Sequence, residues 1–166
     1  MGTGAQRTTL GPLADGLEIT LIEEANSPFR VMFAKAMRDA FRILVVDDER
    51  LICELVESLF DELDVRVETA GSAAEALDRS ARNPPDLILL DVELPGLDGL
   101  AICRLLRTRP RLRDVPIYML TARAGAKDHV ASAEAGATGH IEKPFHGDAL
   151  SEIVARVRHE TVRVNG

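Results

Sequence analysis

Residues 43–49 read Ile-Leu-Val-Val-Asp-Asp-Glu, a run of four aliphatic side chains that ends in three acids. An apolar run without alternation is typical of a strand buried on both faces, as in a parallel sheet. Four more short apolar runs follow along the chain, at residues 65–67, 87–90, 117–120 and 139–141. Each run predicts a β-strand.

Helical periodicity fills the intervals between these runs. The predicted helices cover residues 49–63, a stretch from residue 72, residues 98–109, residues 127–135 and residues 148–159. Ser72 and Glu75 form a capping box at the second helix, and Gly136 ends the fourth. Five strand–helix units in strict alternation predict an α/β fold with a doubly wound, five-stranded parallel sheet.

Polar residues lie at or just beyond the ends of the predicted strands. Asp47 and Asp48 follow the first strand, Asp91 the third, Thr121 the fourth and Lys143 the fifth. In a doubly wound sheet the functional crevice lies at the carboxyl ends of the strands. We therefore expect these five side chains to converge there.

The residue types in this set suit phosphoryl transfer. Three carboxylates packed together repel one another unless a cation is present, and all-oxygen ligands suit Mg²⁺. An aspartate can act as a nucleophile and form an acyl phosphate, while a metal and an ammonium group neutralise the phosphoryl oxygens. A single acid after a strand is more commonly a helix cap, and we expect that role for Asp98, Asp148 and Glu142.

Four segments carry a family resemblance: residues 43–49, residues 86–99 (DLILLDVELPGLDG), residues 119–122 (MLTA) and residues 143–145 (KPF). Together they resemble the receiver domains of two-component response regulators, of the CheY-like, single-domain type. The resemblance covers residues 41–160. It implies a flavodoxin-like (βα)5 fold with strand order 2-1-3-4-5.

The resemblance also implies a metal site. Asp91 would be the phosphoacceptor, and the side chains of Asp48 and Asp91 would bind Mg²⁺. Glu93 would supply its backbone carbonyl, and Asp47 would act mainly through water.

The resemblance further implies how the phosphoryl group is held and sensed. Thr121 and Lys143 would contact it, with the backbone amide of Ala122 assisting, and the Lys143–Pro144 bond would be cis. The switch position three residues before the lysine, usually Tyr or Phe, is His140. In the family, movement of the threonine and this ring re-shapes the face of the fourth helix, fifth strand and fifth helix. Burying a polar ring costs more than burying Phe, so His140 could make the coupling weaker or pH-dependent; the reading we favour is that His140 is a tolerated ring of similar size.

The implied function is that of a phosphorelay regulator rather than an enzyme. A sensor histidine kinase or histidine phosphotransferase would supply the phosphoryl group, the chain would catalyse only its own transfer and dephosphorylation, and a downstream protein would read the changed face. By the same resemblance, the end of the first helix that lies near the site docks the helical phosphodonor. We expect Ile52 or Leu55 to be partly exposed and to contribute to that contact. Glu93 and Arg123 would flank the path of an attacking water, and their opposite charges predict a pair that slows dephosphorylation.

Charge and composition narrow the partners and the location. A net charge of −7 argues against direct binding of nucleic acid. The basic stretch of Arg104, Arg107, Arg111 and Arg113 is expected to be a solvated helix end and loop, and His129, His146 and His159 are expected at the surface.

Cys53 and Cys103 lack metal-ligand spacing and are expected to be free thiols. No apolar run reaches the ~20 residues of a membrane span, and no secretory signal is visible, so we expect a cytoplasmic protein.

Three alternatives share parts of this pattern. The haloacid-dehalogenase phosphatases also use an aspartyl nucleophile, but there the nucleophile comes first and the acid pair last. A nucleotide- or flavin-binding protein requires a Gly-rich loop after the first strand, and residues 47–49 fill that place. A degenerate receiver would lack part of the five-residue set, which is complete here.

The two ends of the chain lie outside the repeating pattern. Residues 1–40 are expected to be a flexible extension or the result of a misassigned start, with Met37 as an alternative first residue and a helix start at Ser27 and Pro28. Residues 161–166 are expected to be a short tail, too short for an output domain.

Overall fold

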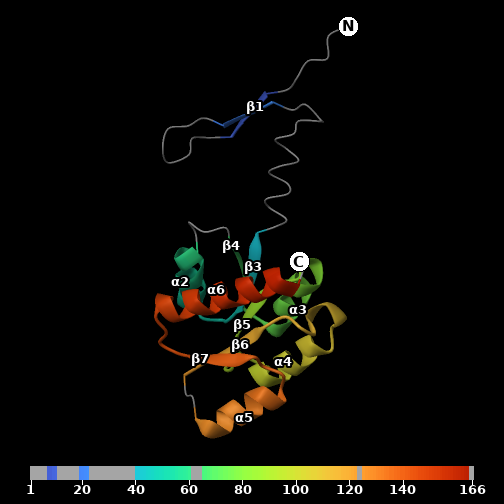
Figure 1. The fold of residues 1–166 in the computed structure, drawn as a ribbon, viewed down its shortest axis with the longest axis vertical. Helices are drawn as coiled ribbons and strands as arrows, with labels where there is room; N and C mark the ends of the chain where they lie inside the picture. The colour runs from blue at the N-terminus through green and yellow to red at the C-terminus, as the bar shows by residue number, and fades with distance from the viewer. Residues whose placement is uncertain (1–6, 11–18, 23–39, 61–64, 123–124, 165–166) are drawn as a thin grey trace. The chain divides into compact units, whose positions relative to one another are not determined.

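In a computed structural model of the chain, the structure describes residues 7–10, 19–22, 40–60, 65–122 and 125–164. The chain divides into two units, residues 1–40 and residues 41–166. In the first unit, β1 (Arg7–Leu10) and β2 (Ile19–Ile22) form an antiparallel pair (Figure 1). The predicted helix start at Ser27 and Pro28 lies outside the described residues.

The second unit is built on one parallel sheet in the order β4-β3-β5-β6-β7. Its strands are β3 (Phe41–Val46), β4 (Val65–Ala70), β5 (Leu87–Asp91), β6 (Ile117–Thr121) and β7 (Gly139–Glu142). The order confirms the predicted doubly wound sheet of order 2-1-3-4-5. Each strand lies at the position predicted from its apolar run.

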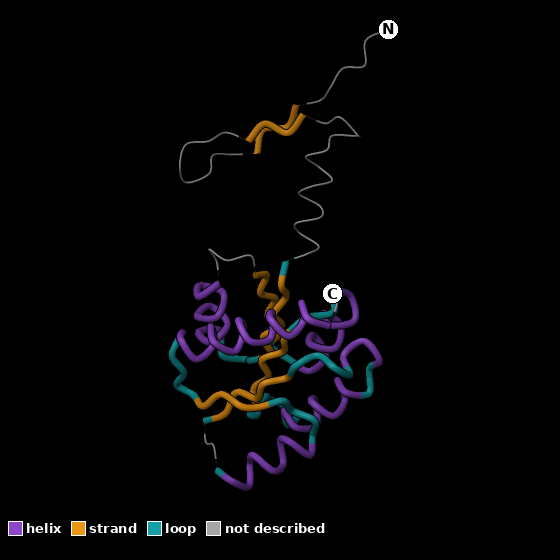
Figure 2. Tube along the Cα trace, in the orientation of Figure 1, coloured by secondary structure: helices purple, strands orange, loops and turns teal. Residues whose placement is uncertain are grey.

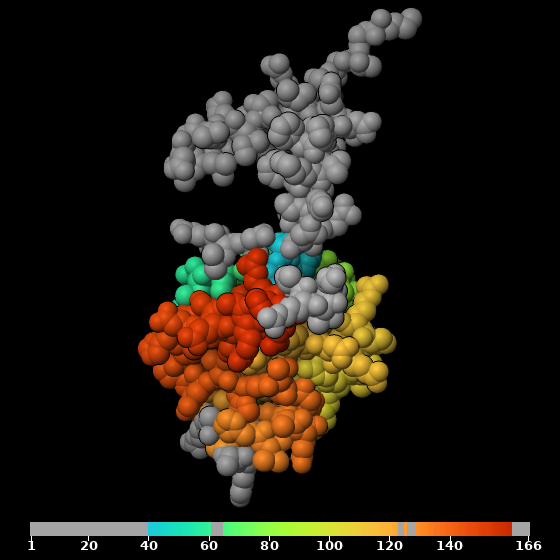
Figure 3. Space-filling view, in the orientation of Figure 1, coloured from blue at the N-terminus to red at the C-terminus, as the bar shows by residue number. Residues whose placement is uncertain are grey.

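Helices flank this sheet on both sides, as Figure 2 shows. They are α2 (Arg50–Phe60), α3 (Ala73–Arg82), α4 (Gly99–Arg107), α5 (Ala126–Glu134) and α6 (Gly147–Val164), with a short 3-10 turn η1 (Pro110–Leu112) after α4. Buried side chains of α2 and α6 pack on one face of the sheet, and those of α3 and α4 pack on the other together with Ala135, which directly follows α5. In the space-filling view, α6 forms a broad band across the near face of this unit (Figure 3).

The aliphatic runs supply the centre of both apolar layers. Along β3, Leu44 and Val46 face the layer under α3 and α4, while Ile43 and Val45 face the layer under α2 and α6. Successive side chains of a strand point to opposite faces. A strand covered by helices on both sides therefore needs the unbroken apolar run that the sequence contains.

Several predicted helix boundaries are confirmed. The Ser72 hydroxyl accepts a hydrogen bond from the Glu75 amide at 3.3 Å, and the Asp98 carboxylate accepts one from the Leu100 amide at 3.0 Å. Gly136 follows α5 with φ of 91°, a left-handed conformation that glycine adopts without strain. Each of these residues ends or begins a helix through interactions within a few residues, which is why the sequence could predict it.

Four other boundary predictions are wrong. Glu142 is the last residue of β7, and Asp148 lies in the first turn of α6, so neither caps a helix. Helix α6 continues to Val164 rather than ending near residue 159, because no glycine or proline interrupts it. Strand β4 extends three residues beyond the apolar run to Ala70; it is an edge strand, where polar side chains can face solvent.

Candidate phosphoacceptor and metal site

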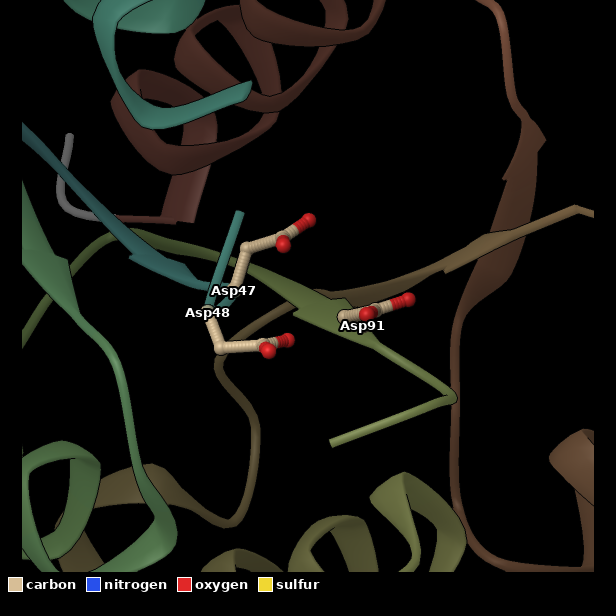
Figure 4. Close-up of side chains that lie close together, drawn as sticks. All are labelled: Asp47, Asp48 and Asp91. Atoms are coloured by element: carbon tan, nitrogen blue, oxygen red, sulfur yellow. The ribbon is translucent and has the colours of Figure 1, made fainter. Parts of the chain in front are cut away.

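The ends of four neighbouring strands supply the site. Asp47 and Asp48 follow β3 directly, Asp91 and Thr121 are the last residues of β5 and β6, and Lys143 follows β7. The strands are parallel, so these residues lie along one edge of the sheet. Figure 4 shows the side chains of the three aspartates pointing to the same side, beyond the ends of β3 and β5.

The three aspartates can share one cation. One carboxylate oxygen from each of Asp47, Asp48 and Asp91 lies within 4.8 Å of the others. Asp47 and Asp91 are buried, whereas Asp48 is exposed, so the cluster opens to water on one side. Oxygen ligands with room for water suit a small, hard divalent cation such as Mg²⁺, and the donor set therefore fits the metal implied by the sequence.

Lys143 lies against this acid cluster. Its ammonium nitrogen Nζ donates a hydrogen bond to Asp47 Oδ2 at 2.7 Å and lies 3.3 Å from Asp91 Oδ1. The lysine backbone amide donates to the carbonyl of Thr121 at 2.7 Å, which ties the residue to the end of β6. The Lys143–Pro144 peptide is cis, as the family resemblance implied.

Burial and the neighbouring charges act in opposite directions on Asp91 and Lys143. Burial raises the pKa of Asp91, and the negative charge of Asp47 adds to this rise, although the charge of Lys143 opposes it. Burial alone would lower the pKa of Lys143, but its hydrogen bond to Asp47 and the charges of Asp47 and Asp91 bring the pKa above its ordinary value. The lysine therefore carries its positive charge beside the central carboxylate.

Glycine at position 99 allows α4 to start directly beside Asp91. A Cβ atom on Gly99 would collide with the backbone carbonyl oxygen of Asp91. The Gly99 amide donates to the carbonyl of Val92 at 3.0 Å, which fixes this close approach. The loop between Asp91 and α4 carries Glu93, whose side chain is exposed and whose backbone amide hydrogen-bonds to the Asp91 carboxylate.

The switch candidate His140 lies on β7, opposite Met119 of β6, and is half-buried. Its ring lies against the ring of His129 from α5, with 3.7 Å between the ring centroids. His129 is exposed as expected, but sequence reasoning missed this contact because the two residues belong to different elements. His146 and His159 are exposed, as predicted.

Sequence reasoning also missed two further contacts. Glu49, the third acid of the opening motif, lies with Oε1 3.2 Å from Lys143 Nζ, and its place beside the acid pair was the available signal. Arg107 contradicts the expectation that the basic stretch is solvated, since it is half-buried and bonds three backbone carbonyls. Arg104, Arg111 and Arg113 are exposed as expected, and Arg123 lies outside the described residues.

Cys53 is half-buried and Cys103 buried, and both are free thiols. Within the described ranges, no helix is both long enough and apolar enough to span a membrane.

Comparisons with known proteins agree with this architecture. A family model described as "Response regulator receiver domain" matches residues 43–155. Response regulator MprA of Mycobacterium sp. (strain KMS) is 45% identical over 117 residues, covering 70% of this chain and 49% of that protein. The MprA of Mycobacterium leprae is 44% identical with the same coverage. The chain thus spans about half the length of these relatives.

Two solved structures illustrate the similarity of fold. Chemotaxis protein CheY4 of Vibrio cholerae has a TM-score of 0.68 at 30% identity, covering 70% of this chain and 98% of that one. A putative response regulator from Chloroflexus aurantiacus has a TM-score of 0.67 at 34% identity, covering 72% and 98%. Both similarities cover nearly the whole of the known structure.

Proposed function

The chain belongs to the response regulator receiver family and so to two-component phosphorelay signalling, and from this premise we propose that Asp91 accepts a phosphoryl group in the presence of Mg²⁺. The donor is a sensor histidine kinase or a histidine phosphotransferase. The observation that carries this proposal is the contact of Lys143 with both Asp47 and Asp91 beside an acid cluster that can hold a cation.

The proposed transfer is a nucleophilic substitution at phosphorus. A carboxylate oxygen of Asp91 forms a bond to phosphorus as the P–N bond of a phosphohistidine donor breaks. The electron pair of the broken bond stays with the imidazole nitrogen, which takes up a proton. With acetyl phosphate, a P–O bond breaks instead and acetate leaves.

Other residues at the strand ends hold the phosphoryl group. Lys143, already 3.3 Å from Asp91, neutralises one phosphoryl oxygen. The hydroxyl of Thr121 and the amide of Ala122 contact the others, a role supported by their position at the end of the neighbouring strand β6. Asp48, Asp91 and the Glu93 carbonyl would hold Mg²⁺, with Asp47 acting through water, and the bound ion would supply positive charge for the phosphoryl oxygens.

The output is a change of shape that controls a partner protein. His140 on β7 is the proposed switch ring, and the face formed by α5, β7 and α6 is the proposed docking surface. The contact of His140 with His129 supports this, because a ring movement on β7 would alter how α5 packs. Signalling through protein docking, without direct binding of nucleic acid, remains our proposal for this chain.

We also propose a cytoplasmic location, which the two free thiols support because thiols persist in a reducing compartment. Residues 1–40 are proposed to be an extension outside the receiver unit, which begins at residue 41 and includes α6 to Val164.

The test is phosphoryl uptake from acetyl phosphate labelled with ³²P, measured with Mg²⁺ and after chelation of Mg²⁺. The expected result is one label on the wild type, lost on chelation and absent from Asp91→Asn. Asp98→Asn is the matched control, because Asp98 caps α4 in the same loop but is outside the acid cluster. Undiminished labelling of Asp91→Asn would refute the assignment, and repeated turnover of a phosphatase substrate would favour the enzyme alternative.

A further inference from the structure

We propose that Glu49 is a positioning residue that directs Lys143 toward the phosphoacceptor. The proposal rests on the proposed function and extends it to an acid that belongs to neither the phosphoacceptor nor the metal cluster. In the structure, Glu49 Oε1 accepts a hydrogen bond from Lys143 Nζ at 3.2 Å, although the two residues are 94 positions apart.

The backbone of Glu49 is fixed on both sides. Its amide donates to Asp47 Oδ1 at 2.8 Å, and its carbonyl accepts from the amide of Ile52 at 3.0 Å in the first turn of α2. The side chain therefore starts from a well-anchored point at the rim of the site. Glu49 itself is 62% exposed, whereas the Lys143 side chain is 13% exposed, so the glutamate reaches inward to the lysine from the solvent side.

The orientation of the three N–H donors of Lys143 depends on more than one acceptor. Lysine carries three N–H donors that rotate together. Asp47 Oδ2 at 2.7 Å and Glu49 Oε1 at 3.2 Å each accept a hydrogen bond from Nζ, and Asp91 Oδ1 lies 3.3 Å from the same nitrogen. With two donors held by Asp47 and Glu49, the third is directed at Asp91 and at the group that Asp91 is proposed to receive.

Glu49 is suited to this task because it has no other role in the cluster. Asp47, Asp48 and Asp91 are the acids whose oxygens lie within 4.8 Å of one another, and Glu49 is not among them. A bound cation would attract the Asp47 carboxylate and weaken its hydrogen bond to Lys143. Glu49 would then still accept a hydrogen bond from the lysine. The lysine then keeps a second anchor in the loaded site.

Two variants separate positioning from simple charge. Glu49→Gln keeps an acceptor oxygen at the same distance along the side chain but removes the negative charge. Glu49→Ala removes both. Glu57→Ala is the matched control, because Glu57 is an exposed acid on α2 for which the described part of the chain shows no ion pair.

The first measurement follows the lysine directly, without metal or donor. The chain has three lysines, Lys35, Lys127 and Lys143, so protein labelled with ¹³C and ¹⁵N in lysine gives a simple NMR spectrum. The signal that disappears in Lys143→Arg is that of Lys143. We expect relaxation to report an ordered Lys143 side chain in the wild type, Glu49→Gln and Glu57→Ala. In Glu49→Ala we expect faster motion at its terminal carbon and nitrogen.

The second measurement is the rate of phosphoryl uptake from acetyl phosphate in Mg²⁺. We expect Glu49→Ala to lower the rate about threefold, a loss of the size that one hydrogen bond contributes, while Glu49→Gln, which keeps the acceptor, and Glu57→Ala stay at the wild-type rate. A Lys143 as ordered in Glu49→Ala as in the wild type overturns the proposal, and so does an equal loss in Glu49→Gln. A wild type that takes up no phosphoryl group refutes the proposed function instead, and leaves the NMR result to decide the role of Glu49.

Discussion

Asp91 is a buried acid with a lysine on one side and a second acid on the other. It is 4% exposed, and burial raises the pKa of its carboxyl group, with the charge of Asp47 adding to the effect. Ionisation of Asp91, which the attack on phosphorus requires, therefore lowers the stability of the folded state. Lys143 offsets part of that cost, which joins the stability of the site to its chemistry.

Replacing Asp91 by Asn is expected to raise the thermal midpoint of the metal-free protein by a few degrees. Because the pKa of Asp91 is raised by folding, the folded protein binds this proton more tightly than the unfolded chain does. Stability is therefore lost as the pH rises from the unfolded pKa through the folded pKa. The difference between Asp91→Asn and wild type should be small in acid, grow across that interval and then stay constant, as measured by calorimetry over a pH series. A difference that shrinks with rising pH would contradict the direction of the shift.

The end of α4 is fastened to the neighbouring elements by a single side chain. The Arg107 guanidinium donates to the carbonyls of Gly136 at 2.8 Å, Leu112 at 2.8 Å and Val115 at 2.6 Å. These carbonyls belong to the turn after α5, to η1 and to the loop before β6. One arginine thus joins three connections on the side of the sheet that carries α4 and α5.

Arg107→Ala is expected to lower the free energy of unfolding by about 3 kcal/mol, because it removes charge-assisted hydrogen bonds to partly buried carbonyls. Arg107→Lys should recover only part of this, since an ammonium group lacks the planar fork of the guanidinium. Urea unfolding monitored by circular dichroism gives the comparison. Arg104→Ala, on the same helix but exposed, is the control and should stay within about 0.5 kcal/mol of wild type.

Helix α2 has more apolar residues than its packing on the sheet uses. Leu51 is 78% exposed and Leu55 41% exposed, while Ile52 is half-buried against the layer under α2 and α6. This confirms the prediction that Ile52 or Leu55 is partly exposed. It supports, by the family resemblance, α2 as the surface that receives the phosphodonor.

Leu55→Ala is expected to lower the rate of transfer from a cognate kinase several-fold relative to the rate from acetyl phosphate, which needs no docking surface. Leu105→Ala is the control, because Leu105 is 38% exposed on a different helix, α4. The two rates are measured by quench-flow with the same protein preparations. An unchanged ratio for Leu55→Ala would exclude this residue from the docking contact.

The strand order of the sheet brings the acids of the cluster together. The order β4-β3-β5-β6-β7 puts β3 beside β5, although α2, β4 and α3 lie between them in the sequence. Asp47 and Asp91 therefore meet across adjacent strand ends, and the unfolded chain has no such cluster. A cation that binds the three acids should then bind the folded state and stabilise it.

Adding MgCl₂ is expected to raise the thermal midpoint, by about 4 °C for each 1 kcal/mol of binding stabilisation in a domain of this size. Asp48→Asn should reduce the shift, because it removes one of the three carboxylates. Differential scanning calorimetry at constant ionic strength, with NaCl as the reference salt, makes the comparison. Equal shifts from NaCl and MgCl₂ would mean that the cluster is not a magnesium site.

The elements and the candidate residues of the site could be predicted from local patterns along the chain. Unbroken aliphatic runs identify strands that must be covered on both faces, and Ser72, Asp98 and Gly136 identify helix ends through chemistry within a few residues. The positions of Asp47, Asp91 and Lys143 at the carboxyl ends of strands follow from the same local pattern. All of these signals act over a few residues, so they can be read along the chain.

Contacts between side chains of different elements could not be predicted from these local patterns. The bond from Lys143 to Glu49, the three carbonyls held by Arg107 and the contact between the rings of His129 and His140 each join separate elements. Such contacts depend on strand order, on the spacing between sheet and helix, and on the rotation of each helix about its axis. Those quantities are set by packing of the whole core, because side chains from every element compete for the same space.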